Sequence, residues 1–180
     1  MAEANRTQAY AAALYAVANA EGQLSSAGDE LFRIARAVEG EDALRDALGD
    51  PHLPAERRQQ IIEELLGSRS SDVTLALASL VVAAGRGREL PAIVDALLKM
   101  SATEEGRQVA EVRSAIALSD EQQERLAAAL RSATGREVDV RVVVDPSVVG
   151  GLMARVGDQV IDGTVRHRLA QLRESLSARS

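Results

Sequence analysis

The chain has 180 residues, of which 46% are apolar and only 2% aromatic, and it contains no cysteine. This length allows one ordinary domain or two small ones, and a core built from Ala, Leu, Val and Ile favours closely packed helices. The absence of cysteine excludes disulfides and thiolate catalysis, and the first residues do not predict a signal peptide. No apolar stretch approaches the roughly 18–20 residues of a membrane-spanning helix, so we expect no direct membrane insertion.

Charge is unevenly distributed along the chain, whose formal net charge is −6. Residues 1–105 hold 10 Lys and Arg against 17 Asp and Glu, a balance of −7, whereas residues 106–180 hold 11 against 10. Binding to nucleic acid requires a basic surface and is helped by aromatic side chains that stack on bases. The sequence therefore argues against a nucleic-acid partner.

The first 105 residues predict six short helices. Apolar side chains recur there with the 3.6-residue period of a helix, and Gly or Pro separates the segments. Asp72 is the expected N-cap of the fifth helix, and Pro91 the start of the sixth. The predicted helices cover approximately residues 6–20, 24–38, 41–48, 54–66, 72–84 and 91–105.

Beyond residue 105 the periodicity changes from that of helices to that of strands. Residues 107–119 and 137–145 alternate apolar with polar side chains, and Ser119 with Gln122 predicts a capping box for a helix between them. Residues 152–156 and 159–163 predict a hairpin, and a stripe of apolar residues predicts a terminal helix. This stripe comprises Val165, Leu169, Leu172 and Leu176.

These patterns predict a mainly α protein with two domains. The N-terminal domain, residues 1–105, is expected to be a six-helix bundle. The C-terminal domain, residues 106–180, is expected to be a smaller α/β part with a small sheet and a terminal helix. The change of periodicity and the change of charge both support a boundary near residue 105.

Several short motifs could carry chemistry, but each has a simpler structural interpretation. Gly150 and Gly151 lie between strand-like segments and belong to no phosphate-binding motif, and Lys99 is the only lysine. The segment GRGR at 85–88 is typical of a helix end followed by a short connector. With two histidines, His52 and His167, and no nucleophile motif, the sequence predicts no catalytic site, metal or cofactor.

The surfaces of two helices are the remaining candidates for function. The first helix carries a face of small residues beside Tyr10 and Leu14, and the fifth is apolar over more of its circumference than a one-sided bundle helix requires. Two such helices side by side could accept an amphipathic helix of a partner, or could simply fill the core of the bundle.

Three segments together resemble one known family. They are R-x-x-A-Y-A-A-A-L-Y-x-x-A at 6–18, VAEVRSAIALSDEQQERLAAAL at 109–130, and VDPSVVGGLMARVGDQVIDGTVRHRLAQL at 144–172. In order and spacing they are similar to the delta subunit of bacterial F-type ATP synthases, whose mitochondrial counterpart is the oligomycin-sensitivity-conferring protein. The resemblance extends over essentially the whole chain.

This resemblance implies a non-catalytic subunit at the cytoplasmic face of the cell membrane. Such a subunit ties the catalytic head to the peripheral stalk, so that the head does not turn with the rotor. A groove between helices 1 and 5 would receive the N-terminal helix of an α subunit, and the C-terminal domain would bind subunit b of the stalk. Carried onto this sequence, the groove falls on Tyr10, Ala13, Leu14, Val17, Leu77, Leu80 and Val81.

An anion- or nucleotide-binding regulatory protein is the alternative from another functional class. In that interpretation the region of Gly150 and Gly151 would bind a small anion. Saturable binding of phosphate or nucleotide by the chain alone would favour this alternative, whereas co-purification with the head and the stalk would favour the connecting subunit.

Overall fold

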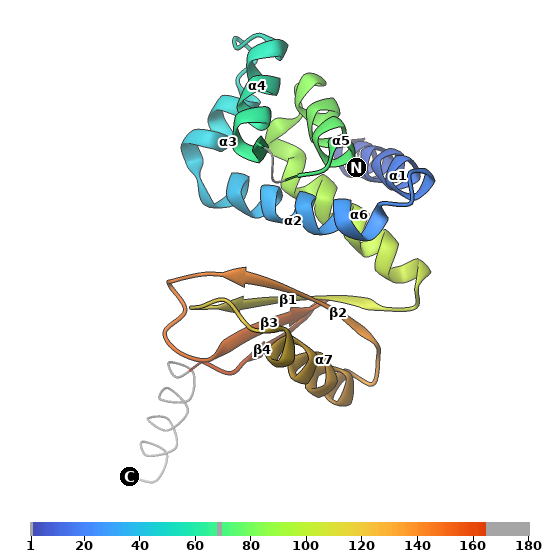
Figure 1. Ribbon diagram of the computed structural model, residues 1–180, viewed down its shortest axis with the longest axis vertical. Coiled ribbons are helices and arrows are strands. Elements are labelled where there is room, and N and C mark those ends of the chain that lie inside the picture. The colour runs from blue at the N-terminus through green and yellow to red at the C-terminus, as the bar shows by residue number, and fades with distance from the viewer. Residues whose placement is uncertain (1, 68–69, 165–180) are drawn as a thin grey trace. The chain divides into compact units, whose positions relative to one another are not determined.

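The computed structural model describes residues 2–67 and 70–164 of the chain. It divides the chain into two compact units, Met1–Ser101 and Ala102–Ser180 (Figure 1). The predicted terminal helix, with Val165 and Leu169, lies outside the described residues. Helices dominate the described part of the chain and a small four-stranded sheet accompanies them, which confirms the mainly helical fold class.

The first unit consists of helices packed around a core of aliphatic side chains. Fully buried residues such as Leu31, Ile62, Val81 and Leu97 come from four different helices, so the core joins distant parts of the sequence. The elements are α1 (Ala2–Ala20), α2 (Leu24–Gly40), α3 (Asp42–Gly49), α4 (Ala55–Leu66), α5 (Asp72–Ala83), the short 3₁₀ helix η2 (Gly87–Glu89) and α6 (Leu90–Glu104).

The ends of these helices follow the expected local chemistry, with one correction. Gly22, Gly67 and Gly85 adopt positive φ just beyond the ends of α1, α4 and α5, where a residue with a Cβ would be strained. The prediction of Asp72 as the N-cap of α5 is wrong, because Ser71 takes that position and its hydroxyl accepts a hydrogen bond from the Thr74 N–H. Asp72 is the first helical residue, where its negative charge favours the helix N-terminus.

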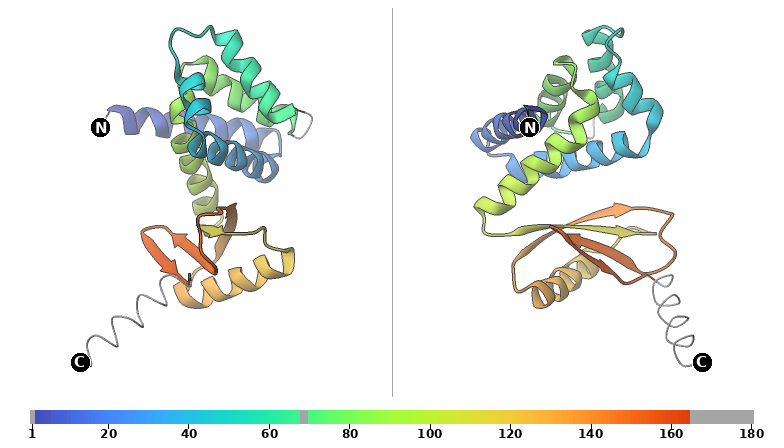
Figure 2. Two further views of the ribbon diagram at one scale, coloured as in Figure 1. Left: turned by 90° about the vertical axis from the view of Figure 1, so that its left-hand side faces the viewer. Right: turned by 180° about the vertical axis from the view of Figure 1, so that it is seen from behind.

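The second unit is a four-stranded sheet with a helix on one face (Figure 2). The strand order is β2-β1-β3-β4, in which β1 and β2 are parallel and the other neighbours are antiparallel. Parallel neighbours require a crossover connection, and α7 lies within it. The elements are β1 (Gln108–Ser114), α7 (Asp120–Thr134), β2 (Val138–Val144), β3 (Leu152–Val156) and β4 (Gln159–Asp162).

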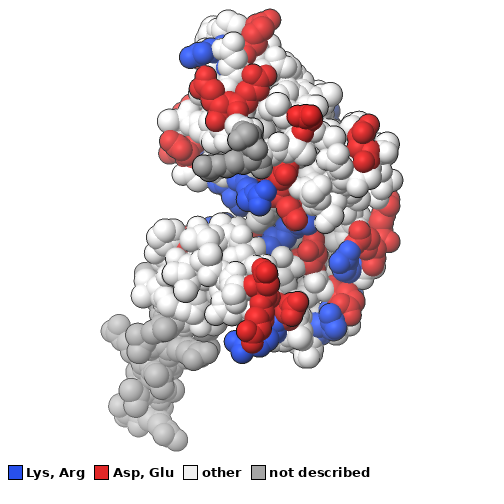
Figure 3. Space-filling model, viewed as in Figure 1, with Lys and Arg blue, Asp and Glu red and all other residues white. Residues whose placement is uncertain are grey.

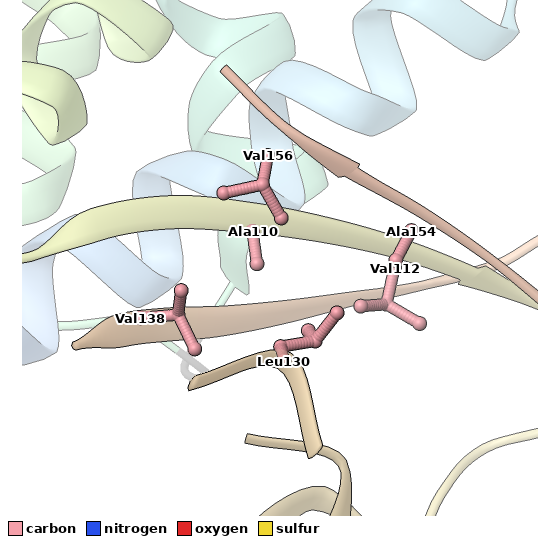
Figure 4. Packing of buried hydrophobic residues seen from close by; sticks show 6 residues of the cluster. All are labelled: Ala110, Val112, Leu130, Val138, Ala154 and Val156. Carbon is pink, nitrogen blue, oxygen red and sulfur yellow. The ribbon is translucent and has the colours of Figure 1, made fainter. Parts of the chain in front are cut away.

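The core of the second unit lies between α7 and the sheet. Figure 4 shows its six buried residues, which come from α7 and from three of the strands. In β1 the alternation predicted from the sequence is confirmed, since Ala110, Val112 and Ser114 are buried. The capping box at the start of α7 is also confirmed, with the side chains of Ser119 and Gln122 each bonded to the other residue's backbone N–H. The core residues are Ala110, Val112, Leu130, Val138, Ala154 and Val156.

The glycine-rich stretch between β2 and β3 is a turn that leads into a close backbone contact. Asp145 begins it, and its Oδ1 accepts a hydrogen bond of 2.9 Å from the Ser147 N–H. Gly150 and Gly151 then follow with φ of 64° and 83°. A Cβ on Gly151 would lie only 2.4 Å from the carbonyl oxygen of Gly163. Backbone geometry and packing therefore explain both glycines without a bound anion.

Candidate partner-binding surface of the helical unit

Helices α1 and α5 contact each other, and both are free of charge along most of their length. Residues 7–20 and 73–85 contain no Asp, Glu, Lys or Arg. Surface helices of soluble proteins normally carry charged side chains on the face that meets water. A contacting pair of charge-free helices in an otherwise acidic unit therefore points to a surface that binds another apolar surface.

The structure divides the seven residues predicted for the groove into two sets. Leu14, Leu77 and Val81 are at most 3% exposed and belong to the core, where they support the surface from below. On the outside, Val17 is 48% exposed and Leu80 is 51% exposed. Ala13 is also exposed, and Tyr10 is partly buried. Val17 and Leu80 are thus the large apolar side chains that these two helices present to solvent.

Further small residues, which are not among the seven predicted for the groove, extend the two exposed stripes. On α5, Ala76 and Ala83 lie one turn before and after Leu80, and both are exposed. On α1, Ala16 and Ala20 extend the stripe beyond Ala13. The sequence shows these alanines at helical spacing, but spacing alone does not separate a buried alanine from an exposed one. We use the term α1–α5 surface for Ala13, Ala16 and Val17 of α1 with Ala76, Leu80 and Ala83 of α5.

The N-terminal end of α5 is fixed to α2 by a carboxylate. Glu30 Oε2 accepts hydrogen bonds from the backbone N–H of Ser71 at 2.9 Å and from its hydroxyl at 3.0 Å. Partial burial acts to raise the pKa of Glu30, but hydrogen bonds from Thr74 and Ser71, together with the charge of Arg33, outweigh it. The pKa of Glu30 is therefore lowered from its ordinary value of 4.5, and the ionised form stabilises the folded unit.

The contact of Glu30 with Ser71 predicts that the stability of the helical unit depends on pH. Because the folded-state pKa of Glu30 lies below its unfolded value, its contribution is complete above the unfolded value and is lost as the pH falls through the lowered pKa. We expect Glu30→Gln to reduce the free energy of unfolding by about 1–2 kcal/mol at pH 7. The difference from wild type should shrink as the pH is lowered from 6 towards 3, as measured by urea denaturation.

Glu64→Gln is the matched control, since Glu64 is exposed on α4. This variant should differ little from wild type at either pH. A destabilisation of Glu30→Gln that stays constant from pH 6 to pH 3 would contradict the role of the ionised carboxylate.

The other end of α5 is held by an arginine. Arg86 follows the helix, and its guanidinium carbon lies 4.9 Å from the centre of the Tyr10 ring on α1. The same guanidinium pairs with the Glu89 carboxylate, and the Arg86 side chain is only 13% exposed. Tyr10, one of the seven residues predicted for the groove, therefore contacts Arg86 of the GRGR segment. That segment forms the helix end and short connector expected from the sequence.

A hollow of about 420 Å³ lies elsewhere on the helical unit and involves neither α1 nor α5. Its lining includes Glu30 and Arg33 of α2 with Leu65 and Leu66 of α4. Within residues 2–67 and 70–164, no group of three His, Asp or Glu side chains is arranged to hold a metal ion. None of the helices in the described part is long and apolar enough to cross a membrane.

Charged side chains are scattered over the visible face of the helical unit, and acidic ones predominate (Figure 3). This agrees with the negative balance of residues 1–105. The molecule is thus a two-unit protein, with a helical unit that exposes apolar helices and a small α/β unit built on a sheet.

Comparison with known proteins identifies the family. The family model described as "ATP synthase delta (OSCP) subunit" matches residues 7–176. The ATP synthase subunit delta of Salinispora arenicola is 40% identical over 168 residues, which cover 93% of this chain and 61% of that protein. The same subunit of Nocardia farcinica is 42% identical over 166 residues, covering 92% and 61%.

A similar solved structure comes from an ATP synthase. A chain of the Toxoplasma gondii mitochondrial ATP synthase hexamer, determined by cryo-EM, matches with a TM-score of 0.56 and 28% identity, covering 94% of this chain and 96% of that one. The chain therefore belongs to the ATP synthase delta (OSCP) subunit family, as its resemblance predicts. It spans about three fifths of the length of the two bacterial relatives, since the matches cover 61% of each.

Proposed function

We propose that this chain is a non-catalytic stator subunit of an F-type proton-translocating ATP synthase. It links the catalytic head to the peripheral stalk at the cytoplasmic face of the cell membrane, as a peripheral protein without a cofactor of its own. Family membership supports the assignment to this complex. The charge-free α1–α5 surface is the single observation in this structure that supports a binding role for the helical unit.

In this proposal α1–α6 act as a six-helix bundle over residues 1–105, and the α1–α5 surface receives the N-terminal helix of an α subunit. Val17 and Leu80 supply the largest exposed apolar side chains of α1 and α5, and the exposed alanines of the same helices allow a partner helix to approach closely. An amphipathic helix that lays its apolar face on such a surface gains affinity mainly from burial of aliphatic side chains.

The second unit, residues 106–180, binds subunit b of the stalk in the same proposal. A stator must resist torque, so slow dissociation matters more than fast encounter. A Kd of about 1 nM corresponds to roughly −12 kcal/mol. Binding the head and the stalk through separate units adds avidity, because each contact keeps the other partner at high effective concentration.

Reconstitution with purified components tests the proposal. The full chain should co-purify with the isolated catalytic head and with a complex of the head and subunit b, and it should restore the coupling of head to stalk. Calorimetry of the chain alone with phosphate or ATP should give no saturable binding. Failure to associate with the head, or tight binding of either anion, would instead support the regulatory alternative.

A further inference from the structure

Arg86 is placed by the backbone turn that ends α5. Gly85 has a φ of 75°, its N–H donates to the Val82 carbonyl at 3.0 Å, and the Arg86 N–H donates to the Val81 carbonyl at 3.1 Å. Such a left-handed turn reverses the chain at the end of a helix. The Arg86 side chain consequently reaches α1, where its guanidinium covers the ring of Tyr10.

Arg86 contacts α1 by stacking its guanidinium on the Tyr10 ring. Its Nη2 pairs with Glu89, which lies on the same connector, so this ion pair fixes the guanidinium locally and does not reach α1. Its Nε is buried and has no hydrogen-bond partner among the described residues. A guanidinium removed from water interacts more strongly with an aromatic face than one at an exposed site. The Tyr10 ring is the aromatic face on α1 with which this guanidinium interacts.

The buried residues of α1 and α5 contribute packing rather than charge to the contact between the two helices. Their buried residues are small or aliphatic, and such contacts are not directional. Because residues 7–20 and 73–85 carry no charged side chain, no ion pair can join these two segments. A planar guanidinium on an aromatic ring, by contrast, is a directional contact. It lies at one end of the surface that a partner helix would cover.

We propose that Arg86 is a positioning residue that holds Tyr10 against the end of α5 and so fixes the spacing and alignment of the α1–α5 surface. The inference rests on the proposed function, because the surface matters only if a partner helix binds there. It identifies a contact outside the exposed stripes that controls the affinity of the site for an aliphatic, amphipathic helix.

A direct test measures the geometry of the free chain without any partner. Because the chain contains no cysteine, two cysteines introduced together, one at Ala13 and one at Ala76, can carry a pair of spin labels. Both positions are exposed. The distance distribution between the labels should be narrow in the wild-type background and in Arg88→Ala. It should be clearly broader or displaced in Arg86→Ala. Arg88 is the matched control, since it is exposed and pairs with Asp46 on α3.

Binding to the purified catalytic head provides the second readout. We expect Arg86→Ala to weaken binding by about tenfold, within the 2- to 30-fold range of one cation–π contact. Arg86→Lys, which keeps the charge but loses the planar stacking, should show an intermediate effect. Tyr10→Leu, which removes the ring, should weaken binding about as much as Arg86→Ala. The double variant Tyr10→Leu with Arg86→Ala should be much less impaired than the two single effects combined.

The outcomes separate this inference from the proposed function. If Arg86→Ala leaves both the distance distribution and the affinity for the head unchanged, Arg86 does not position the two helices. A substitution of the exposed Leu80 then still tests whether the α1–α5 surface binds the head. Full additivity of the Tyr10 and Arg86 variants also overturns the role of Arg86. If Arg86→Ala does not fold, Arg86→Lys and Arg86→Gln replace it in both measurements. If wild type fails to bind the head, the proposed function falls, and the distance measurement still decides whether Arg86 aligns the helices.

Discussion

Leu80→Asp in the full chain is expected to weaken binding to the catalytic head by about a hundredfold or more, with the helical unit still folded. Leu80 is 51% exposed, so the carboxylate is solvated in the free chain. In the complex the variant loses the burial of the exposed half of a leucine side chain, about 1–1.5 kcal/mol, and must also desolvate a charge. A hundredfold loss corresponds to about 2.7 kcal/mol, which requires both the lost burial and the desolvation of the charge.

The measurement is a titration of the purified head with the variant, beside circular dichroism to confirm the fold. Leu65→Asp is the matched control, because Leu65 is 42% exposed on α4 and belongs to neither α1 nor α5. Its affinity for the head should stay within about twofold of wild type. Equal affinities of the Leu80 and Leu65 variants would remove the α1–α5 surface from the binding site.

Leu77→Asp, one turn earlier on the same helix, is expected to unfold the helical unit. Leu77 is only 3% exposed, so the variant deletes a core leucine and places a carboxylate in an aliphatic environment. Loss of the leucine side chain alone destabilises by about 2–5 kcal/mol, and the unpaired buried charge adds to this. The sum is comparable with the whole stability of a small domain, about 5–15 kcal/mol.

Denaturation followed by far-ultraviolet circular dichroism tests this expectation, with Leu77→Ala as the intermediate variant. The order of stability should be wild type, then Leu77→Ala, then Leu77→Asp. If Leu77→Asp loses less than about 1 kcal/mol, Leu77 does not lie in the core. Until its stability is known, a loss of head binding by this variant says nothing about a direct contact with the head.

Local signals in the sequence predicted most of the elements. The helices that end at Gly22 and Gly67, the capping box at Ser119 and the hairpin of β3 and β4 each depend on residues close together in the chain. The N-cap of α5 was misplaced by one residue, because Ser71 and Asp72 are both good caps and only Ser71 also reaches Glu30. Neighbouring residues could not decide between them.

The candidate site was less predictable for a related reason. On a helix that is apolar all round, periodicity cannot separate the buried Leu77 from the exposed Leu80, since both continue the same pattern. The contact between Tyr10 and Arg86 joins residues far apart in the chain, as does the pairing of β1 with β3. Such contacts depend on how whole elements pack, and one sequence carries no local signal for them.

The contact between Gly151 and Gly163 changes how the glycine-rich stretch should be understood in this chain. The Gly163 N–H donates to the Leu152 carbonyl at 2.9 Å, while the Gly163 carbonyl oxygen occupies the space that a side chain at 151 would need. A Cβ on Gly163 would in turn lie 3.2 Å from the Leu152 oxygen. Gly151 before β3 and Gly163 after β4 therefore pack directly against each other, and a protein engineer must redesign the two positions together.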